Sequence, residues 1–226
     1  MQSKILMGLA VVVAAGLLNT GAWADDSDDG LVDGMKLVEK NSRGEIYTDP
    51  GVVWSTYDRV ILDQASVAFR KNWQRDQNRH QSFKVRTEDM DRIKAELAEM
   101  FGEVFSKELT ENGGYTLTEE SSDNTLRITP HIVDLDVYAP DTRPANISQT
   151  YTETAGRMTL KLEIYDSVTG DLISRASHRQ EAPRKGYMQW TTSVTNRAEF
   201  RRMLERWAKG LRERLDDARK TSPDAS

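Results

Sequence analysis

The sequence contains no cysteine. This excludes disulfide bonds, thiolate nucleophiles, cysteine-based zinc and iron–sulfur sites, and a cysteine that would accept a lipid after export. Histidine is scarce, with 3 residues, His80, His131 and His178, whose spacing matches no metal-binding motif. The chain also lacks the glycine-rich phosphate-binding and dinucleotide-binding motifs and the serine-hydrolase elbow. We therefore predict no metal centre and no cofactor.

An excess of basic residues is absent as well. The chain has 31 Lys and Arg against 36 Asp and Glu, a net charge of −5, which argues against a dedicated nucleic-acid-binding protein. Hydrophobic residues make up 38% of the chain and charged residues 30%. This composition is leaner in apolar residues than an average globular protein but richer than a disordered chain, so it predicts one modest core.

Long apolar runs are confined to the N-terminus. Lys4 precedes 14 apolar residues, Ile5 to Leu18, and Ala22-Trp23-Ala24 follows them. This is the pattern of a secretory signal peptide cleaved between Ala24 and Asp25. About 20 apolar residues are needed to span a bilayer, and no second long run follows, so we expect no transmembrane segment in the mature chain. Loss of Lys4, the only charge before the cleavage site, leaves a net charge of −6.

Hydrophobic periodicity predicts an α+β fold. Apolar residues recur every three or four positions from Thr87, a plausible N-cap, to Gly113, and again from Asn196 to Leu215, where Glu199 would complete a capping box. Alternating or β-branched runs predict strands at residues 57–69, 115–120, 126–138, 158–165 and 172–179. We therefore expect a mainly antiparallel sheet of about five strands, with two amphipathic helices packed on one face.

The expected organisation has four parts. They are a signal peptide (1–24), an acidic tail and extended lead-in (25–50), a single α+β domain (51–220) and a polar tail (221–226). Pro130 lies inside one expected strand and cannot donate a ladder hydrogen bond. It therefore predicts either an edge strand or a bulge at that point.

Three stretches resemble a bacterial family known as domain of unknown function 3313. They are residues 31–73, above all the run YTDPGVVWSTYDRVILDQ from Tyr47, residues 126–137 with VDLDV, and residues 200–215 with Arg206-Trp207-Ala208. The resemblance covers nearly all of residues 31–219. Its members are described as lipoproteins of the bacterial envelope, so it implies a periplasm-facing location and supplies no activity. No cysteine follows the signal here, which favours a released periplasmic form.

Two stretches are candidate contact surfaces for an envelope protein or an anionic envelope component. Residues 70–86 carry a local charge of +5 with interleaved aromatic residues, and residues 183–190 form a second basic and aromatic segment. The alternatives are a solvated connection between a strand and a helix, and loop aromatics packed on the core. The candidate partner-binding residues are Arg70, Lys71, Trp73, Arg75, Arg79, Arg184, Lys185, Tyr187 and Trp190.

These features favour a non-enzymatic periplasmic interaction module, accessory to a cell-envelope assembly. One alternative is a hydrolase of an envelope polymer that uses His131 with Asp134 and Asp136. Strand alternation would place the two carboxylates on the face opposite His131, unless a bulge at Pro130 shifts the parity. Another alternative is a carrier of a small anionic or lipid ligand, which requires an apolar pocket.

Overall fold

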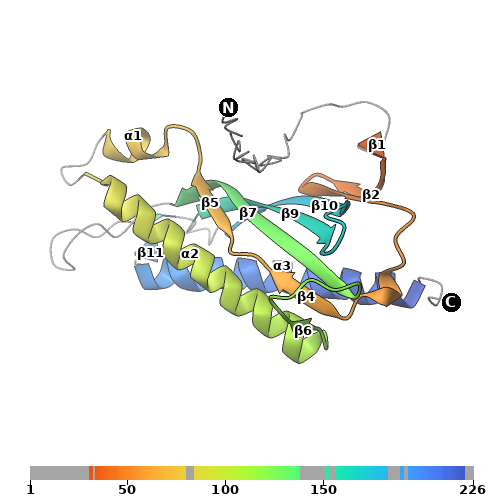
Figure 1. The fold of residues 1–226 in the computed structure, drawn as a ribbon. Coiled ribbons are helices and arrows are strands. Elements are labelled where there is room, and N and C mark those ends of the chain that lie inside the picture. The colour runs from red at the N-terminus through yellow and green to blue at the C-terminus, as the bar shows by residue number, and fades with distance from the viewer. Residues whose placement is uncertain are drawn as a thin grey trace, which may run out of the picture.

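The computed structural model describes residues 31–32, 34–79, 84–137, 151–152, 156–182, 189–190 and 193–221. Helices and sheet form an α+β arrangement in which α2 and α3 lie along the sheet while α1 lies at one end of it (Figure 1). The helices are α1 (Trp73–Asn78), α2 (Thr87–Lys107) and α3 (Ser193–Thr221), with a 3₁₀ turn at Trp54–Thr56 and a π-helical turn at Glu108–Asn112.

Within the described residues, the main sheet has nine strands, in the order β1-β2-β3-β10-β9-β7-β4-β6, with β5 also paired to β7. Their bounds are β1 (Leu31–Val32), β2 (Met35–Asn41), β3 (Gly44–Thr48), β4 (Arg59–Leu62), β5 (Ser66–Phe69), β6 (Thr116–Leu117), β7 (Thr125–Val137), β9 (Gly156–Asp166) and β10 (Leu172–Glu181). A separate pair joins β8 (Tyr151–Thr152) to β11 (Gln189–Trp190).

The α+β class is confirmed, but the expected number of elements is wrong: within the described residues the main sheet has nine strands rather than about five, and there are three α-helices rather than two. Residues 35–48, expected as an extended lead-in, form a hairpin whose second strand pairs with β10. The β4–β6, β4–β7 and β5–β7 pairs are parallel, so the sheet is mixed. The parallel pairing arises because α2 carries the chain from the end of β5 back to the end of the sheet at which β4 begins, where β6 and β7 then start.

Pro130 lies in the middle of the sheet rather than at an edge. β7 pairs with β9 along one side, where Pro130 is opposite Leu162, and with β4 and then β5 along the other. The expected single strand 57–69 is interrupted at residues 63–65, and Pro130 lies beside this interruption, between Ile128 and His131. A residue without an N–H is tolerated here because the neighbouring strand is broken at this position.

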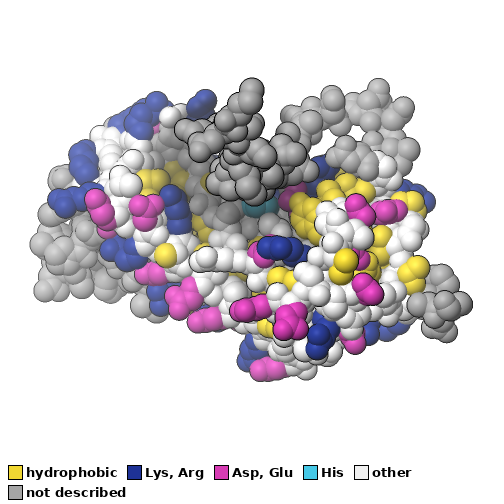
Figure 2. All heavy atoms as spheres, viewed as in Figure 1, with side chains coloured by type: hydrophobic (Ala, Val, Ile, Leu, Met, Phe, Trp, Pro, Cys, Tyr) yellow, Lys and Arg dark blue, Asp and Glu magenta, His cyan; other side chains and the backbone are white. Residues whose placement is uncertain are grey.

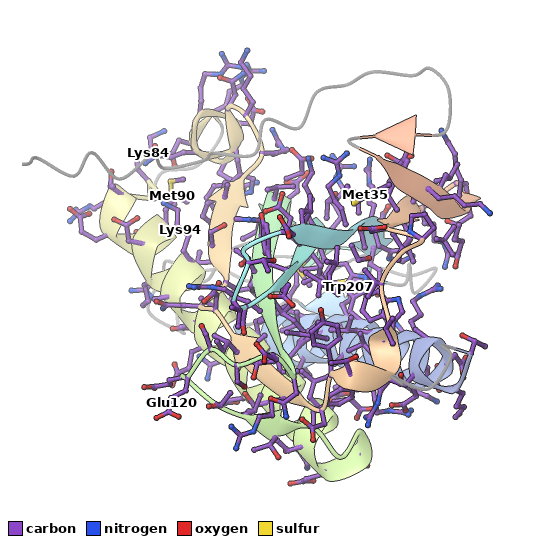
Figure 3. The ribbon with its side chains drawn as sticks, turned by 45° about the vertical axis from the view of Figure 1, so that its right-hand side comes forward. Met35, Lys84, Met90, Lys94, Glu120 and Trp207 are labelled. Atoms are coloured by element: carbon purple, nitrogen blue, oxygen red, sulfur yellow. The ribbon has the colours of Figure 1, made fainter. Side chains whose placement is uncertain are left out.

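The core lies between the sheet and the apolar faces of α2 and α3, as the periodicity predicts. Phe101 and Phe105 stack at 3.8 Å between ring centroids, and both are fully buried. From α3, Met203 and Leu204 are fully buried, and Trp207 lies where the helix meets the sheet (Figure 3). Such burial is the main favourable contribution to folding.

The helix starts differ from the sequence predictions. Arg86, not Thr87, is the N-cap of α2, and its backbone N–H donates to the Asp89 carboxylate at 3.0 Å. α3 begins at Ser193, three residues before the expected Asn196, so the expected capping-box position lies inside the helix. Glu199 instead accepts a hydrogen bond from Arg202 at 2.7 Å.

Candidate functional site

Trp73 fixes α1 to the end of the sheet. Its side chain is 1% exposed, its indole N–H donates to the Val137 carbonyl at 3.2 Å, and its ring stacks on Phe69 at 4.1 Å. Asn72 precedes the helix in the left-handed region, with φ of 61°, a conformation that Asn tolerates better than most residues. Trp73, predicted as a contact residue, is therefore a core residue that positions its exposed neighbours.

Arg70 lies at the base of α1, between two carboxylates. Its Nη1 is 2.8 Å from Asp76 and its Nε is 3.0 Å from Asp136. The hydrogen bond from Arg70 lowers the pKa of Asp76, and the bond to Asp76 raises the pKa of Arg70. Asp136 is buried and also pairs with Arg157 at 3.0 Å. The charge of Arg70 is thus balanced within the fold.

Lys71, Arg75 and Arg79 are the predicted cations that remain exposed, and we call them the α1 basic surface. The side chain of Arg75 is 65% exposed and reaches Asp76 at 3.4 Å. Lys and Arg side chains gather over α1 and the start of α2 (Figure 2). Because Trp73 and Arg70 hold the helix, these cations project from a fixed support.

The other predicted contact residues lie outside the described residues or in the short strand β11. Arg184, Lys185 and Tyr187 lie outside the described residues, as do Ala24 and Asp25 of the predicted cleavage site. Trp190 is in β11, where its backbone pairs with Tyr151 of β8.

The three residues of the hydrolase alternative, His131, Asp134 and Asp136, do not form a common site. Asp134 is exposed at a bulge in β7, where its φ is 52° and the register with β9 shifts between Val133 and Asp136. This bulge reverses which face of the sheet the following side chains occupy. The sequence placed such a shift at Pro130, but it occurs four residues later. It turns Asp136 toward Arg157, and the Arg70 and Arg157 contacts both use its Oδ2, while its buried Oδ1 has no hydrogen-bond partner among the described residues.

His131 instead belongs to a polar row on the side of the sheet opposite the core. Its Nδ1 is 2.7 Å from the Ser66 hydroxyl, and its Nε2 is 3.7 Å from the buried Glu163 carboxylate. Tyr165 donates to the same carboxylate at 2.7 Å, and burial together with this bond raises the pKa of Tyr165. Sequence reasoning missed Ser66 and Glu163 because the row depends on two registers between distant strands, the parallel β5–β7 pair for Ser66 and the antiparallel β7–β9 pair for Glu163.

Within the described ranges, no three or more His, Asp or Glu side chains are placed to hold a metal ion. In the same part of the chain, no helix is long and apolar enough to cross a bilayer.

Comparisons with solved structures find several distant likenesses. One is protein XCC0632 from Xanthomonas campestris, at 11% identity and a TM-score of 0.43, covering 73% of this chain and 86% of that one. Another is the PelC dodecamer from Paraburkholderia phytofirmans, at 8% identity and a TM-score of 0.36, covering 74% and 96%. A third is a minor lipoprotein from Acinetobacter baumannii, at 15% identity and a TM-score of 0.33, covering 75% and 98%. Likenesses this distant indicate no function for this chain.

The curated proteins contain no match to the sequence. The family model described as "Protein of unknown function (DUF3313)" matches residues 29–211, in agreement with the resemblance drawn from the three sequence stretches. Since this match covers most of the polypeptide, the chain belongs to the DUF3313 family.

Proposed function

We propose that the protein is exported to the periplasm and acts there as a non-enzymatic binding module that holds an anionic component of the cell envelope. Export is supported by the charged, apolar and small-residue segments of the first 24 residues. Binding is supported by the α1 basic surface, in which one exposed cation lies on a helix fixed by a fully buried tryptophan and the other two flank its ends.

A fixed helix matters for affinity because a partner need not order the surface as it binds. Exposed cations also attract an anionic partner over a distance of roughly 8–10 Å at physiological salt, which speeds association. Each exposed ion pair contributes only about 0.2–1 kcal/mol, so the three cations together account for roughly a tenfold change in affinity, or somewhat more.

The experiment is crosslinking in intact cells, followed by purification and mass spectrometry of the captured partners. The variant carries Lys71→Glu, Arg75→Glu and Arg79→Glu. The matched control carries Lys107→Glu, Lys209→Glu and Lys220→Glu, which change the net charge equally at exposed sites on α2 and α3. We expect one envelope component to be enriched with the native chain and the control, and lost with the α1 variant. Equal capture by both variants would contradict the proposal.

A second candidate is hydrolysis of an envelope polymer, in which His131 keeps its predicted place but Ser66 and Glu163 replace Asp134 and Asp136. It is favoured by the 2.7 Å contact between the Ser66 hydroxyl and His131, since a hydroxyl bonded to an imidazole is the nucleophile pair of serine hydrolases. Glu163 would orient the ring from its other side.

Labelling with a fluorophosphonate probe tests this second candidate. Hydrolysis predicts covalent labelling that Ser66→Ala abolishes and that Ser177→Ala, a change in another strand of the same sheet, leaves intact. Absence of labelling on the folded protein would remove the candidate.

A further inference from the structure

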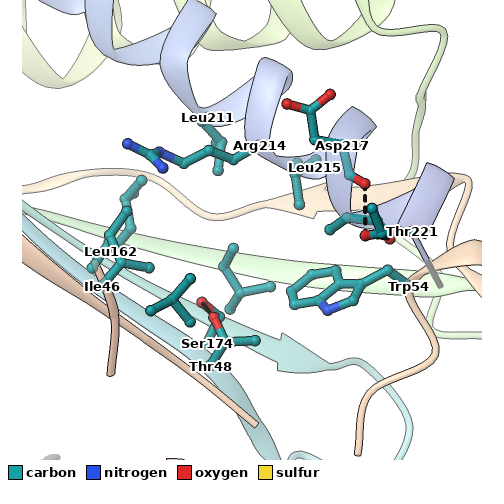
Figure 4. Close-up of a pocket in the computed structure, with 14 residues that line it drawn as sticks. Ile46, Thr48, Trp54, Leu162, Ser174, Leu211, Arg214, Leu215, Asp217 and Thr221 are labelled. Atoms are coloured by element: carbon teal, nitrogen blue, oxygen red, sulfur yellow. Dashed lines mark hydrogen bonds between the residues drawn. The ribbon is translucent and has the colours of Figure 1, made fainter. Parts of the chain in front are cut away.

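A cavity of about 400 Å³ lies between the C-terminal half of α3 and the sheet (Figure 4). This volume falls within the roughly 300–1,000 Å³ that small-molecule sites occupy. α3 forms one wall with Leu211 and Leu215, and strands β3, β9 and β10 form the other. Trp54, from the 3₁₀ turn, lies at one end (Figure 4). The other apolar lining residues are Val38, Ile46, Leu162, Ile164, Ala176 and Ala218.

The hydroxyl groups in the cavity wall already use their protons within the fold. Ser174 donates to the Tyr47 carbonyl at 2.9 Å, and Thr48 lies 3.1 Å from the Ser174 oxygen, to which it can donate. Thr221, beside Trp54 at the same end of the cavity (Figure 4), donates to the Asp217 carbonyl at 2.9 Å. The cavity therefore suits an apolar chain better than a polar ligand, which would need free donors from these groups.

A smaller cavity of about 180 Å³ continues the first one along α3. The two share Ile46, Leu162, Ala176, Leu211 and Arg214, so we call them together the α3 groove. Gly210 lines the smaller cavity, and a Cβ placed on it would meet no atom within 4 Å. Glycine in a helix interior costs about 1 kcal/mol relative to alanine, and no close contact requires it here.

Charged side chains line part of this groove. Arg214 is the charged residue that both cavities share, and Glu39, Glu45 and Arg206 also line the smaller cavity. Arg214 extends from α3 and pairs with Glu39 of β2 at 2.7 Å, with half of its side chain exposed. Glu39 is also held by Asn41 at 2.9 Å. Asp217, the acidic residue in the lining, points its carboxylate away from the cavity (Figure 4) and is 76% exposed. Val38, beside the β2 bulge, leaves a 63% exposed apolar side chain at the rim.

We propose that the α3 groove binds a single-chain amphiphile, with its acyl chain along the cavity and its anionic head group at Arg214. The apolar walls match the chain, and the guanidinium, whose Glu39 contact uses Nη2, keeps further N–H donors for a carboxylate or phosphate. The groove and the α1 basic surface are formed by different elements. The two proposals can therefore fail separately.

The test is a fluorescence titration of the purified protein without its predicted signal peptide. The probe is 11-(dansylamino)undecanoic acid, and other amphiphiles then compete with the bound probe. We expect saturable binding at one site per chain. Competing carboxylates from 8 to 14 carbons should bind about fourfold more tightly per added methylene, until the cavity is full. Dodecanoate and dodecyl phosphate should outcompete dodecanol and dodecyltrimethylammonium, and whichever of the two anions binds more tightly identifies the head group. Absence of saturable binding, or tighter binding of the cation, would overturn the proposal.

Variants locate the binding site. Arg214→Gln should weaken dodecanoate about tenfold and leave dodecanol unchanged. Arg201→Gln is the matched control, because it removes an equivalent ion pair on the same helix, between Arg201 and Glu103 of α2. Gly210→Leu adds a side chain where the backbone leaves space, and Ala176→Phe fills the part shared by both cavities, so each should reduce probe binding more than fivefold. Unchanged binding in a folded Ala176→Phe or Gly210→Leu protein would overturn the assignment, and the competition series tests it even if a variant does not fold.

Discussion

Replacement of Trp73 tests whether one buried side chain holds α1 to the sheet. Trp73→Ala removes a fully buried indole, its stacking on Phe69 and its hydrogen bond to Val137. Substitutions of this kind cost about 3–5 kcal/mol. Trp73→Phe keeps most of the ring volume but leaves the Val137 carbonyl without its indole donor, which costs about 1–2 kcal/mol. Total stabilities of domains are about 5–15 kcal/mol, so both changes are large enough to measure.

Equilibrium urea unfolding followed by far-ultraviolet circular dichroism is the assay. With a slope of about 2–3 kcal/mol per molar urea, Trp73→Ala should lower the midpoint by roughly 1–2 M, and Trp73→Phe by roughly 0.5 M. Hydrogen exchange of the α1 amides adds a local readout, because a helix of six residues released from the sheet should lose its protection. A midpoint within about 0.3 M of the native value for Trp73→Ala, with unchanged protection of α1, would refute the reasoning.

Three further predictions follow from other contacts. Burial, and then the charges of Arg43 and Arg214, lower the pKa of His178, whose Nδ1 accepts a hydrogen bond from Trp207 at 2.8 Å. The unfolded chain therefore binds this proton more readily, so stability present above pH 6.5 should fall as the pH drops below it, and His178→Asn should flatten this dependence. Burial, and then Asp166, raise the pKa of Tyr57 to about 12. Stability present below pH 10 should therefore fall between pH 10 and about 12, which thermal unfolding of Tyr57→Phe against the native chain would check. Gly44→Ala would place a Cβ 1.9 Å from the Ser177 carbonyl oxygen, so it should destabilise the β3–β10 pair by roughly 2 kcal/mol or more in urea unfolding, whereas Gly210→Ala, with open space around it, should not.

Local patterns predicted the elements whose contacts are local. The apolar stripes of α2 and α3 and the alternation of β9 are strong because each element buries one face. The turn at Asp166 joins β9 to β10 and could be identified because its residues are turn formers. By contrast, the six residues of α1 are too few for a periodic signal, and only tertiary packing shows that Trp73 is buried.

The candidate sites depended on contacts between residues distant in the sequence. Ser66 meets His131 because β5 is parallel to β7, a register that neither strand's own sequence specifies. The position of the bulge at Asp134 decided which face Asp136 occupies, and Pro130 was the wrong marker for it. The α3 groove depends on how one helix lies over four strands. The sequence could therefore show only that a ligand carrier would need an apolar pocket, not where that pocket lies.

The pairing order of the sheet also limits when the chain can fold. β3 pairs with β10 across a gap of 126 residues, as the Thr48–Ser174 contact measures, and β4 reaches β7 across about half that separation. A hairpin such as β2–β3 is marginal by itself in water. Contacts this distant must close long loops before they stabilise anything, so they form slowly. Because the chain is synthesised from its N-terminus, its first third is made before β7, β9 and β10, the strands that complete the sheet. It therefore spends that interval as unpaired strands, open to chaperones and to wrong partners.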